Sequence, residues 1–252
     1  MYLVRNAQKT FRMLQPLLLV CLGILQEAYS FEWKDPLLTK DELATYRTLS
    51  EGKDLGVKKE LKVVVHEREY EVTFSVIDKE GRSEFAAAFT RGTGFGPVRY
   101  SRKKTDASRD FIIQEEIQLK DNPNYSRNTC PLFGNLLAFR GLCRHTQQTR
   151  LEYPCLFPGG SSFLLLLKTT SGQRIHTPAG PFDCLRIEET VEMQSLIKGV
   201  FGTIMGVLPI RIVPKTTYWF CSEYPHVLVR RDGVAGPPPH DYIVTDELIR
   251  YE

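Results

Sequence analysis

The residues of this 252-residue chain that could do chemistry are its cysteines and a few of its histidines. Thiolate and imidazole groups bind zinc, and a thiol beside a histidine can act as a nucleophile. Two thiols can instead form a disulfide, which is the usual outcome in an oxidising compartment. Five of the six cysteines follow the first 30 residues of the chain: Cys130, Cys143, Cys155, Cys184 and Cys221.

The nearest approach to a metal-binding motif is Cys143-Arg144-His145, with Cys130 and Cys155 on either side. The paired C-x-x-C spacing that is typical of structural zinc sites is absent from it. We therefore expect no metal centre, and no other motif in the chain indicates a cofactor.

A thiol nucleophile would be Cys184 or Cys221, activated by His176 or His226. Both cysteines lie in expected strands, where a packed or bridged cysteine is commoner. We therefore expect no catalytic residue and a non-enzymatic protein, with a cysteine- or histidine-dependent enzyme as the third alternative.

All five cysteines are disulfide candidates, and their odd number leaves at least one unpaired within a monomer. We expect one bridge among Cys130, Cys143 and Cys155, and a second between Cys184 and Cys221.

The N-terminus has the pattern of a secretory signal peptide. Arg5, Lys9 and Arg12 precede the apolar run Leu17–Leu25, and the small residues of Ala28-Tyr29-Ser30 follow it. Nine apolar residues are fewer than the roughly 20 that span a bilayer. We expect cleavage after residues 1–30 and an exported protein, periplasmic or associated with the outer envelope. An uncleaved N-terminal anchor is the alternative.

The charge of the chain argues against nucleic-acid binding. Removing residues 1–30, which hold Arg5, Lys9, Arg12 and Glu27, lowers the formal net charge from +3 to +1. Nucleic-acid binding needs a concentrated cationic surface. No transmembrane span is expected after cleavage, because Pro209 and Arg211 interrupt the longest remaining apolar segment.

The segment from Asp35 to Leu55 has a helical pattern. Thr39 and Glu42 have the spacing of a capping box, and Leu43, Tyr46 and Leu49 recur at helical intervals. We expect a helical segment over residues 31–60 and a single β-rich domain over residues 61–252.

Beyond Leu61 the apolar period changes to two, as in Tyr70–Val76, where every second residue is apolar. No regular helices separate the expected strands, and a turn is expected at Ser171-Gly172. This pattern predicts a mainly β fold, an antiparallel and strongly curved sheet or half-open barrel with one or two short helices. The further expected strands are Phe111–Leu119, Ser162–Thr169, Phe182–Val191, Thr216–Ser222, Val227–Arg231 and Val244–Tyr251.

The stretch Thr177-Pro-Ala-Gly-Pro-Phe182 predicts a sharp corner between two strands, because its prolines cannot donate hydrogen bonds within a sheet. It resembles the T-P-A-G-x-F corner of a family of bacterial exported domains of unknown function. Tyr218–Arg230 resembles the Y-W-F…P…V-R closing hairpin of that family, and the resemblance runs from about Leu61 to the C-terminus. It implies a periplasmic β-rich fold akin to half-barrels that hold lipid or lipoprotein segments, and it implies no catalytic residues.

The segment Gly199–Val213 carries more apolar residues than an exposed loop would. An ordinary core segment and a flexible cover over an apolar cavity are both open interpretations. Our first hypothesis is a binder of an apolar ligand or lipid in a half-barrel. The alternative is an envelope assembly protein that docks a protein partner through this segment. The ligand-lining candidates are Phe201, Ile204, Met205, Leu208, Trp219 and Phe220.

Overall fold

A computed structural model describes residues 33–106, 111–119, 130–131, 135–144, 150–156, 162–191, 215–234 and 242–252. These ranges contain thirteen strands of one sheet and one helix, α2 (Asn135–Cys143). The strands are β1 (Glu42–Ser50), β2 (Lys53–Val65), β3 (Glu69–Asp78), β4 (Gly81–Thr90), β5 (Pro97–Asp106), β6 (Phe111–Gln118), β7 (Cys130–Pro131), β8 (Arg150–Leu156), β9 (Ser162–Thr177), β10 (Gly180–Val191), β11 (Thr216–Cys221), β12 (Leu228–Val234) and β13 (Ile243–Tyr251).

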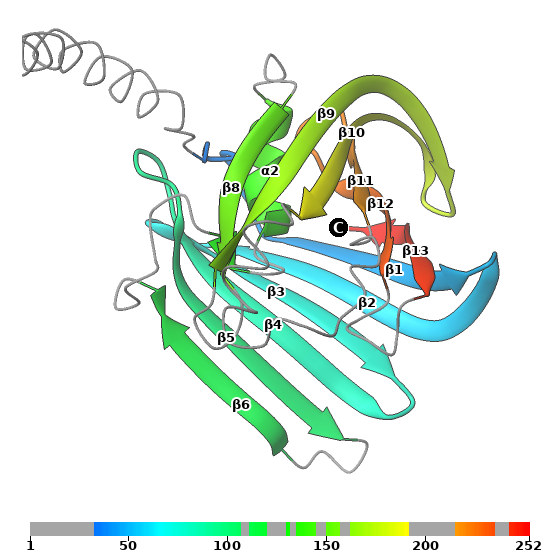
Figure 1. The fold of residues 1–252 in the computed structure, drawn as a ribbon, viewed down its shortest axis with the longest axis horizontal. Coiled ribbons are helices and arrows are strands. Elements are labelled where there is room, and N and C mark those ends of the chain that lie inside the picture. The colour runs from blue at the N-terminus through cyan, green and yellow to red at the C-terminus, as the bar shows by residue number, and fades with distance from the viewer. Residues whose placement is uncertain are drawn as a thin grey trace, which may run out of the picture. The chain divides into compact units, whose positions relative to one another are not determined.

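The sheet has the order β6-β5-β4-β3-β2-β1-β13-β12-β11-β10-β9-β8-β7. Its pairs are antiparallel except for the two-residue strand β7, which runs parallel to β8. The sheet bends strongly, so that β8 to β12, with the long β9–β10 hairpin, form an upper wing and β1 to β6 form a lower wing (Figure 1). The two ends of the sheet, β6 and β7, do not pair with each other, so the expected half-open, curved antiparallel sheet is confirmed.

The expected helix within residues 31–60 is wrong, since β1 and most of β2 occupy this segment. Leu43, Tyr46 and Leu49 fit a helical period, but the buried residues of β1 follow a strand period instead. Because β1 pairs with β2 on one edge and with β13 on the other, its backbone N–H and C=O groups form hydrogen bonds on both sides. A short isolated helix is only marginally stable in water, so the strand is favoured. The β-rich part of the chain therefore begins before Leu61.

The expected strands beyond Leu61 are confirmed. In β3, Tyr70, Val72 and Phe74 are buried, as the alternation predicts. The last four expected strands, which begin at Phe182, Thr216, Val227 and Val244, correspond to β10, β11, β12 and β13. The predicted corner is the tight connection between Thr177 and Gly180, which pair with each other at the end of the β9–β10 hairpin.

The expected turn at Ser171-Gly172 is wrong, because β9 continues through it as a bulge. Arg186 pairs with Thr170 and Cys184 pairs with Gln173, so two residues of β9 face one residue of β10. Gly172 has a φ of 81°, a backbone conformation that glycine adopts at little cost.

The helix α2 is buried on all sides, and it packs on one face of the sheet. The Phe139 ring lies 5.3 Å from the Tyr218 ring and 6.3 Å from the Phe220 ring, measured between centroids. We call the sheet face that contacts α2 the inner face. The helix also meets the backbone of the N-terminal segment, because a Cβ atom at Gly141 would lie 1.8 Å from the carbonyl oxygen of Lys34.

The expected signal peptide (residues 1–30) and the whole segment Gly199–Val213 lie outside the described residues. Within the described ranges, no helix has the length and apolar character that crossing a membrane requires.

We predict that Gly141→Ala destabilises the protein by about 1–3 kcal/mol, the usual cost of forcing extra atoms into a packed site. The added methyl group would displace the Lys34 backbone from α2. Urea unfolding followed by circular dichroism measures this cost, and an unchanged unfolding midpoint would show that the helix and the N-terminal segment do not pack together.

Candidate functional site

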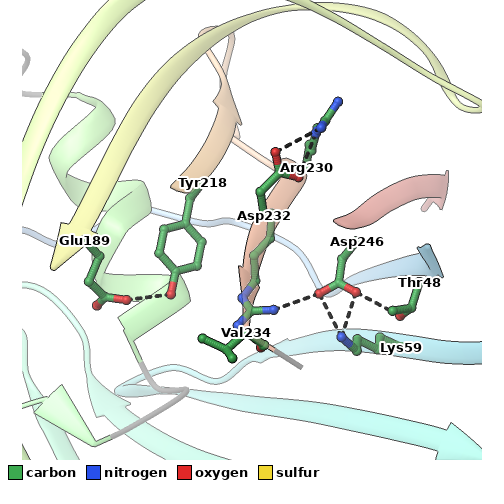
Figure 2. A network of polar contacts seen from close by, with 9 residues as sticks. Thr48, Lys59, Glu189, Tyr218, Arg230, Asp232, Val234 and Asp246 are labelled. Atoms are coloured by element: carbon green, nitrogen blue, oxygen red, sulfur yellow. Dashed lines mark hydrogen bonds and ion pairs between the residues drawn. The ribbon is translucent and has the colours of Figure 1, made fainter. Parts of the chain in front are cut away.

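The centre of the inner face holds a buried carboxylate with three donors. Asp246 on β13 accepts hydrogen bonds from Lys59 Nζ at 2.6 and 2.8 Å and from Thr48 Oγ1 at 2.8 Å. Arg231 on β12 donates to the same carboxylate at 3.1 Å, and Figure 2 shows these contacts converging on Asp246. Four adjacent strands, β1, β2, β12 and β13, therefore meet at one group.

The environment shifts the pKa values of both cations at this carboxylate. Burial lowers the pKa of Lys59, and the negative charge of Asp246 only partly opposes this. Burial also acts to lower the pKa of Arg231, but Tyr218 and Asp246 outweigh it and the pKa is raised. Arg231 therefore stays charged, and Lys59 is the cation whose charged form burial disfavours.

A second buried carboxylate, Glu189 on β10, lies further along the inner face. It accepts hydrogen bonds from Tyr218 Oη at 2.7 Å (Figure 2) and from Asn135 Nδ2 at 3.0 Å. The Tyr153 hydroxyl donates to it as well. Because Asn135 opens α2 and Tyr153 lies on β8, Glu189 ties the helix to three strands of the upper wing.

A third buried pair fixes the other end of α2. Arg140 forms an ion pair with Glu42 on β1, and both side chains are almost fully buried. Tyr46 on the same strand donates a hydrogen bond to the carbonyl oxygen of Leu228 at 3.0 Å. Arg140 keeps one buried atom, Nε, without a hydrogen bond to the described residues. The ion pair and the Tyr46 hydrogen bond nevertheless favour a structural role over acid–base catalysis.

Apolar residues continue the inner face over the lower wing, where they face each other across neighbouring strands. Leu61, Phe74 and Phe85 are paired in register across β2, β3 and β4. Leu61 and Phe74 are buried, whereas Phe85 is only half-buried. Beside them, Phe85 and the half-buried Ile117 pack against the buried residues Tyr100 and Leu119.

Two polar groups on this wing are buried without a partner. The Tyr100 hydroxyl and the Arg102 Nε atom make no hydrogen bond to the part of the chain that the structure describes. The Arg102 guanidinium lies 5.7 Å from the Phe85 ring centroid. Burial raises the pKa of Tyr100 to about 12, so its hydroxyl stays protonated and can donate. Buried polar groups of this kind usually have a partner, and a ligand can supply it.

The two described ligand-lining candidates, Trp219 and Phe220, are not brought together. Neighbouring residues of a strand project from opposite faces, and Phe220 lies on the inner face under α2. Trp219 lies on the outer face, where the Cζ atoms of Arg186 and Arg230 are 5.9 and 5.2 Å from the centroid of its ring. Its indole N–H donates a hydrogen bond to the side-chain oxygen of Gln173. The remaining candidates, Phe201, Ile204, Met205 and Leu208, lie outside the described residues.

The cysteines occupy several places in the fold. Cys184 and Cys221 face each other in the β10–β11 pair, and Cys143 closes α2; all three carry free thiols. Cys130 and Cys155 face each other in the β7–β8 pair, as register partners. A bridge among Cys130, Cys143 and Cys155 stays a prediction.

The thiol environment opposes nucleophilic catalysis. Burial raises the pKa of Cys143 and of Cys184 to about 12, and it also raises the pKa of Cys221. His226 Nδ1 lies 3.1 Å from the backbone oxygen of Cys221. Burial lowers the pKa of this histidine. A reactive cysteine needs the opposite shift, towards thiolate. Among the described residues, no cluster of three or more potential ligands could hold a metal ion.

The buried charges Lys59, Glu189, Arg231 and Asp246 were not among the residues that the sequence predicted for the site. A signal for them exists in the strand period, because Lys59 shares a face with Leu61 and Val63. A charged residue at an apolar position of a strand indicates a buried polar partner.

Comparison with solved structures gives three chains of similar extent. A protein from Bacteroides fragilis described as exported, with a YmcC-like fold, is 10% identical with a TM-score of 0.35, over 88% of this chain and 99% of that chain. A chain described as a lipoprotein from Parabacteroides distasonis is 12% identical with a TM-score of 0.40, over 89% and 99%. The lipoprotein LppX from Mycobacterium tuberculosis is 13% identical with a TM-score of 0.28, over 84% and 85%.

Similarity at this level does not establish a shared function. The resemblance of the T-P-A-G-x-F corner and the closing hairpin to a family of exported domains stays a prediction. No protein-family model matches the chain, and no curated protein matches it.

We predict that Asp246→Asn costs about 3–5 kcal/mol of unfolding free energy, because it leaves the buried Lys59 and the partly buried Arg231 without a countercharge. The matched control is Asp232→Asn, which breaks the more exposed pair with Arg230 (Figure 2) and should cost about 1 kcal/mol or less. Urea unfolding measures both, and equal costs would contradict the importance of the buried carboxylate.

We also predict that the fold loses stability as the pH rises from 10 to 12. Burial and a hydrogen bond to Asp35 raise the pKa of Tyr70 from 10.0 to about 12, and burial does the same for Tyr100. Above pH 10 the unfolded chain releases these protons first, so it binds fewer protons than the folded chain and unfolding is favoured. Tyrosinate absorbance should therefore rise together with the loss of circular dichroism. Ionisation of all tyrosines in a folded chain at pH 10 would contradict this.

Proposed function

We propose that this protein is exported, is not an enzyme, and binds an apolar ligand such as a lipid against the inner face of its sheet over β3 to β6. The observation that carries the proposal is the half-buried apolar surface around Phe85 and Ile117, next to the buried Tyr100 hydroxyl without a partner. Both features belong to one wing of the sheet.

The apolar surface would gain from being covered. Phe85, Val76 and Ile117 are each half-buried, although neighbouring residues of the same face are fully buried. Covering apolar surface contributes about 25 cal/mol for each Å² removed from water, so an acyl chain laid along these side chains would bind favourably. The polar partners of a binding site are few and fix the ligand's orientation.

Tyr100 and Arg102 are suited to the polar end of such a ligand. A protonated hydroxyl and a guanidinium are both hydrogen-bond donors, so they match an acceptor such as a carboxylate or ester oxygen. The ligand class supported best is therefore an apolar chain that ends in an oxygen acceptor.

The support for export is the signal-peptide pattern at the N-terminus, in which Arg5, Lys9 and Arg12 precede the apolar run Leu17–Leu25. The alternative function is an envelope assembly protein that docks a partner through the segment Gly199–Val213.

The test compares two variants of one strand. Phe85→Asp places a charge on the inner face, whereas Ala86→Asp places the same charge on the opposite face of β4. The full-length protein is titrated with cis-parinaric acid, a fluorescent fatty acid. We expect Phe85→Asp to weaken binding at least about tenfold, a loss of about 1.4 kcal/mol, and Ala86→Asp to leave it nearly unchanged.

Native mass spectrometry of the protein purified from its own host completes this test. Bound mass in the lipid range that is lost in Phe85→Asp would support the proposal. Equal binding by the two variants, or no binding of the fatty acid by the folded wild-type protein, would contradict it. Co-purification of a protein instead of a lipid would favour the docking alternative.

A further inference from the structure

Cys184 and Cys221 are placed opposite each other by the strand register. They are direct partners in the antiparallel β10–β11 pair. The next partners, Asp183 and Ser222, share a backbone hydrogen bond, in which Ser222 N donates to Asp183 O at 2.7 Å. Hydrogen-bonded and non-hydrogen-bonded partners alternate along an antiparallel pair, so Cys184 and Cys221 are a non-hydrogen-bonded pair.

The backbone N–H of Cys221 confirms this assignment. It donates to Val227 O at 2.8 Å, on the side of β12, and so points away from β10. Partners of the non-hydrogen-bonded kind have Cα atoms about 4.5 Å apart and the closer side chains. That separation lies within the range of about 4.4–6.8 Å that disulfides span.

The two thiols project from one face of the sheet. They lie two residues along from Arg186 and Trp219, which are register partners in contact on the outer face. Cys143 belongs to α2, which packs on the inner face, and its thiol donates a hydrogen bond to Phe139 O at 3.3 Å. The strand register therefore pairs Cys184 with Cys221, whereas Cys143 has no register partner, although it lies near enough to both thiols for them to raise its pKa.

We propose that Cys184 and Cys221 are a disulfide-forming pair that is oxidised by thiol–disulfide exchange, with Cys143 excluded from the bridge. The oxidant is a disulfide, RS–SR. Cys221 is the entry point, because it is partly exposed whereas Cys184 is buried. The Cys221 thiolate attacks one sulfur of RS–SR and releases RS⁻, which takes up the Cys221 proton.

The second step closes the bridge. The Cys184 thiol loses its proton, and the resulting thiolate attacks the Cys221 sulfur of the mixed disulfide. The second RS⁻ is released and takes up the proton from Cys184. Two thiols are oxidised to one disulfide, and RS–SR is reduced to two RSH. The neighbouring thiol and burial both raise the pKa of Cys184, so the rate should increase with pH as thiolate forms.

The bridge would join two strands that are far apart in sequence. β10 ends at Val191 and β11 begins at Thr216, so the cross-link closes a loop that includes the residues between them. A closed loop restricts the unfolded chain, and reduction should lower the melting temperature by roughly 5–15 °C.

The test uses the purified full-length chain, reduced and then incubated with glutathione disulfide, so that it depends neither on export nor on ligand binding. Remaining thiols are blocked with iodoacetamide, and the unreduced protein is digested and mapped by mass spectrometry. We expect a peptide that links Cys184 to Cys221 in the wild type and in Cys143→Ser, and its loss in Cys184→Ser.

The melting temperature gives a second readout. Dithiothreitol should lower it more for the wild type and Cys143→Ser than for Cys184→Ser, in which it can reduce only a bridge among the other cysteines. A bridge from Cys143 to either strand cysteine would overturn the proposal, as would glutathione adducts without an internal link. If Cys184→Ser fails to fold, the wild-type map still decides the pairing. Phe85→Asp should keep the bridge, which separates a failure of this inference from a failure of the ligand proposal.

Discussion

The ion pairs of Asp246 with Lys59 and Arg231 hold the centre of the sheet, and the rest of the structure is arranged around them. Buried charges are stable only when they are paired and hydrogen-bonded, so all the partners must reach one point. A shift of one residue in the register of β13 would turn Asp246 to the outer face and leave both cations buried without it. The requirement therefore selects one register across β2, β1, β13 and β12.

This central constraint also divides the inner face into two parts. On one side, α2 fills the curve of the upper wing and is held by Glu189 and by the Arg140–Glu42 pair. On the other side, the lower wing keeps apolar residues that are only half-buried, among them Phe85 and Ile117. The upper wing is an ordinary packed core. The lower wing is the part where we propose that a ligand binds.

The sequence predicted the fold class well, because strand periodicity is a local signal. Tyr70, Val72 and Phe74 alternate with polar residues, and that alternation indicates a strand whatever its neighbours are. The helix expected around Tyr46 failed because Leu43, Tyr46 and Leu49 fit a helical period, whereas the non-local pairing with β2 and β13 makes the segment a strand. The buried site was missed for a similar reason. Lys59 and Asp246 are far apart in sequence, and nothing local shows that they meet.

The pairing of Cys184 with Cys221 could be predicted from the sequence, because it depends only on the register of two recognisable strands.

The central functional claim is that the lower wing of the inner face holds an apolar ligand. A crystal structure of the protein purified from its host without removal of lipid tests this most directly. The account predicts electron density for an acyl chain along Phe85 and Ile117, with its polar end at the Tyr100 hydroxyl and the Arg102 guanidinium. An inner face that the chain's own residues cover completely, with Tyr100 and Arg102 hydrogen-bonded to them, would contradict it.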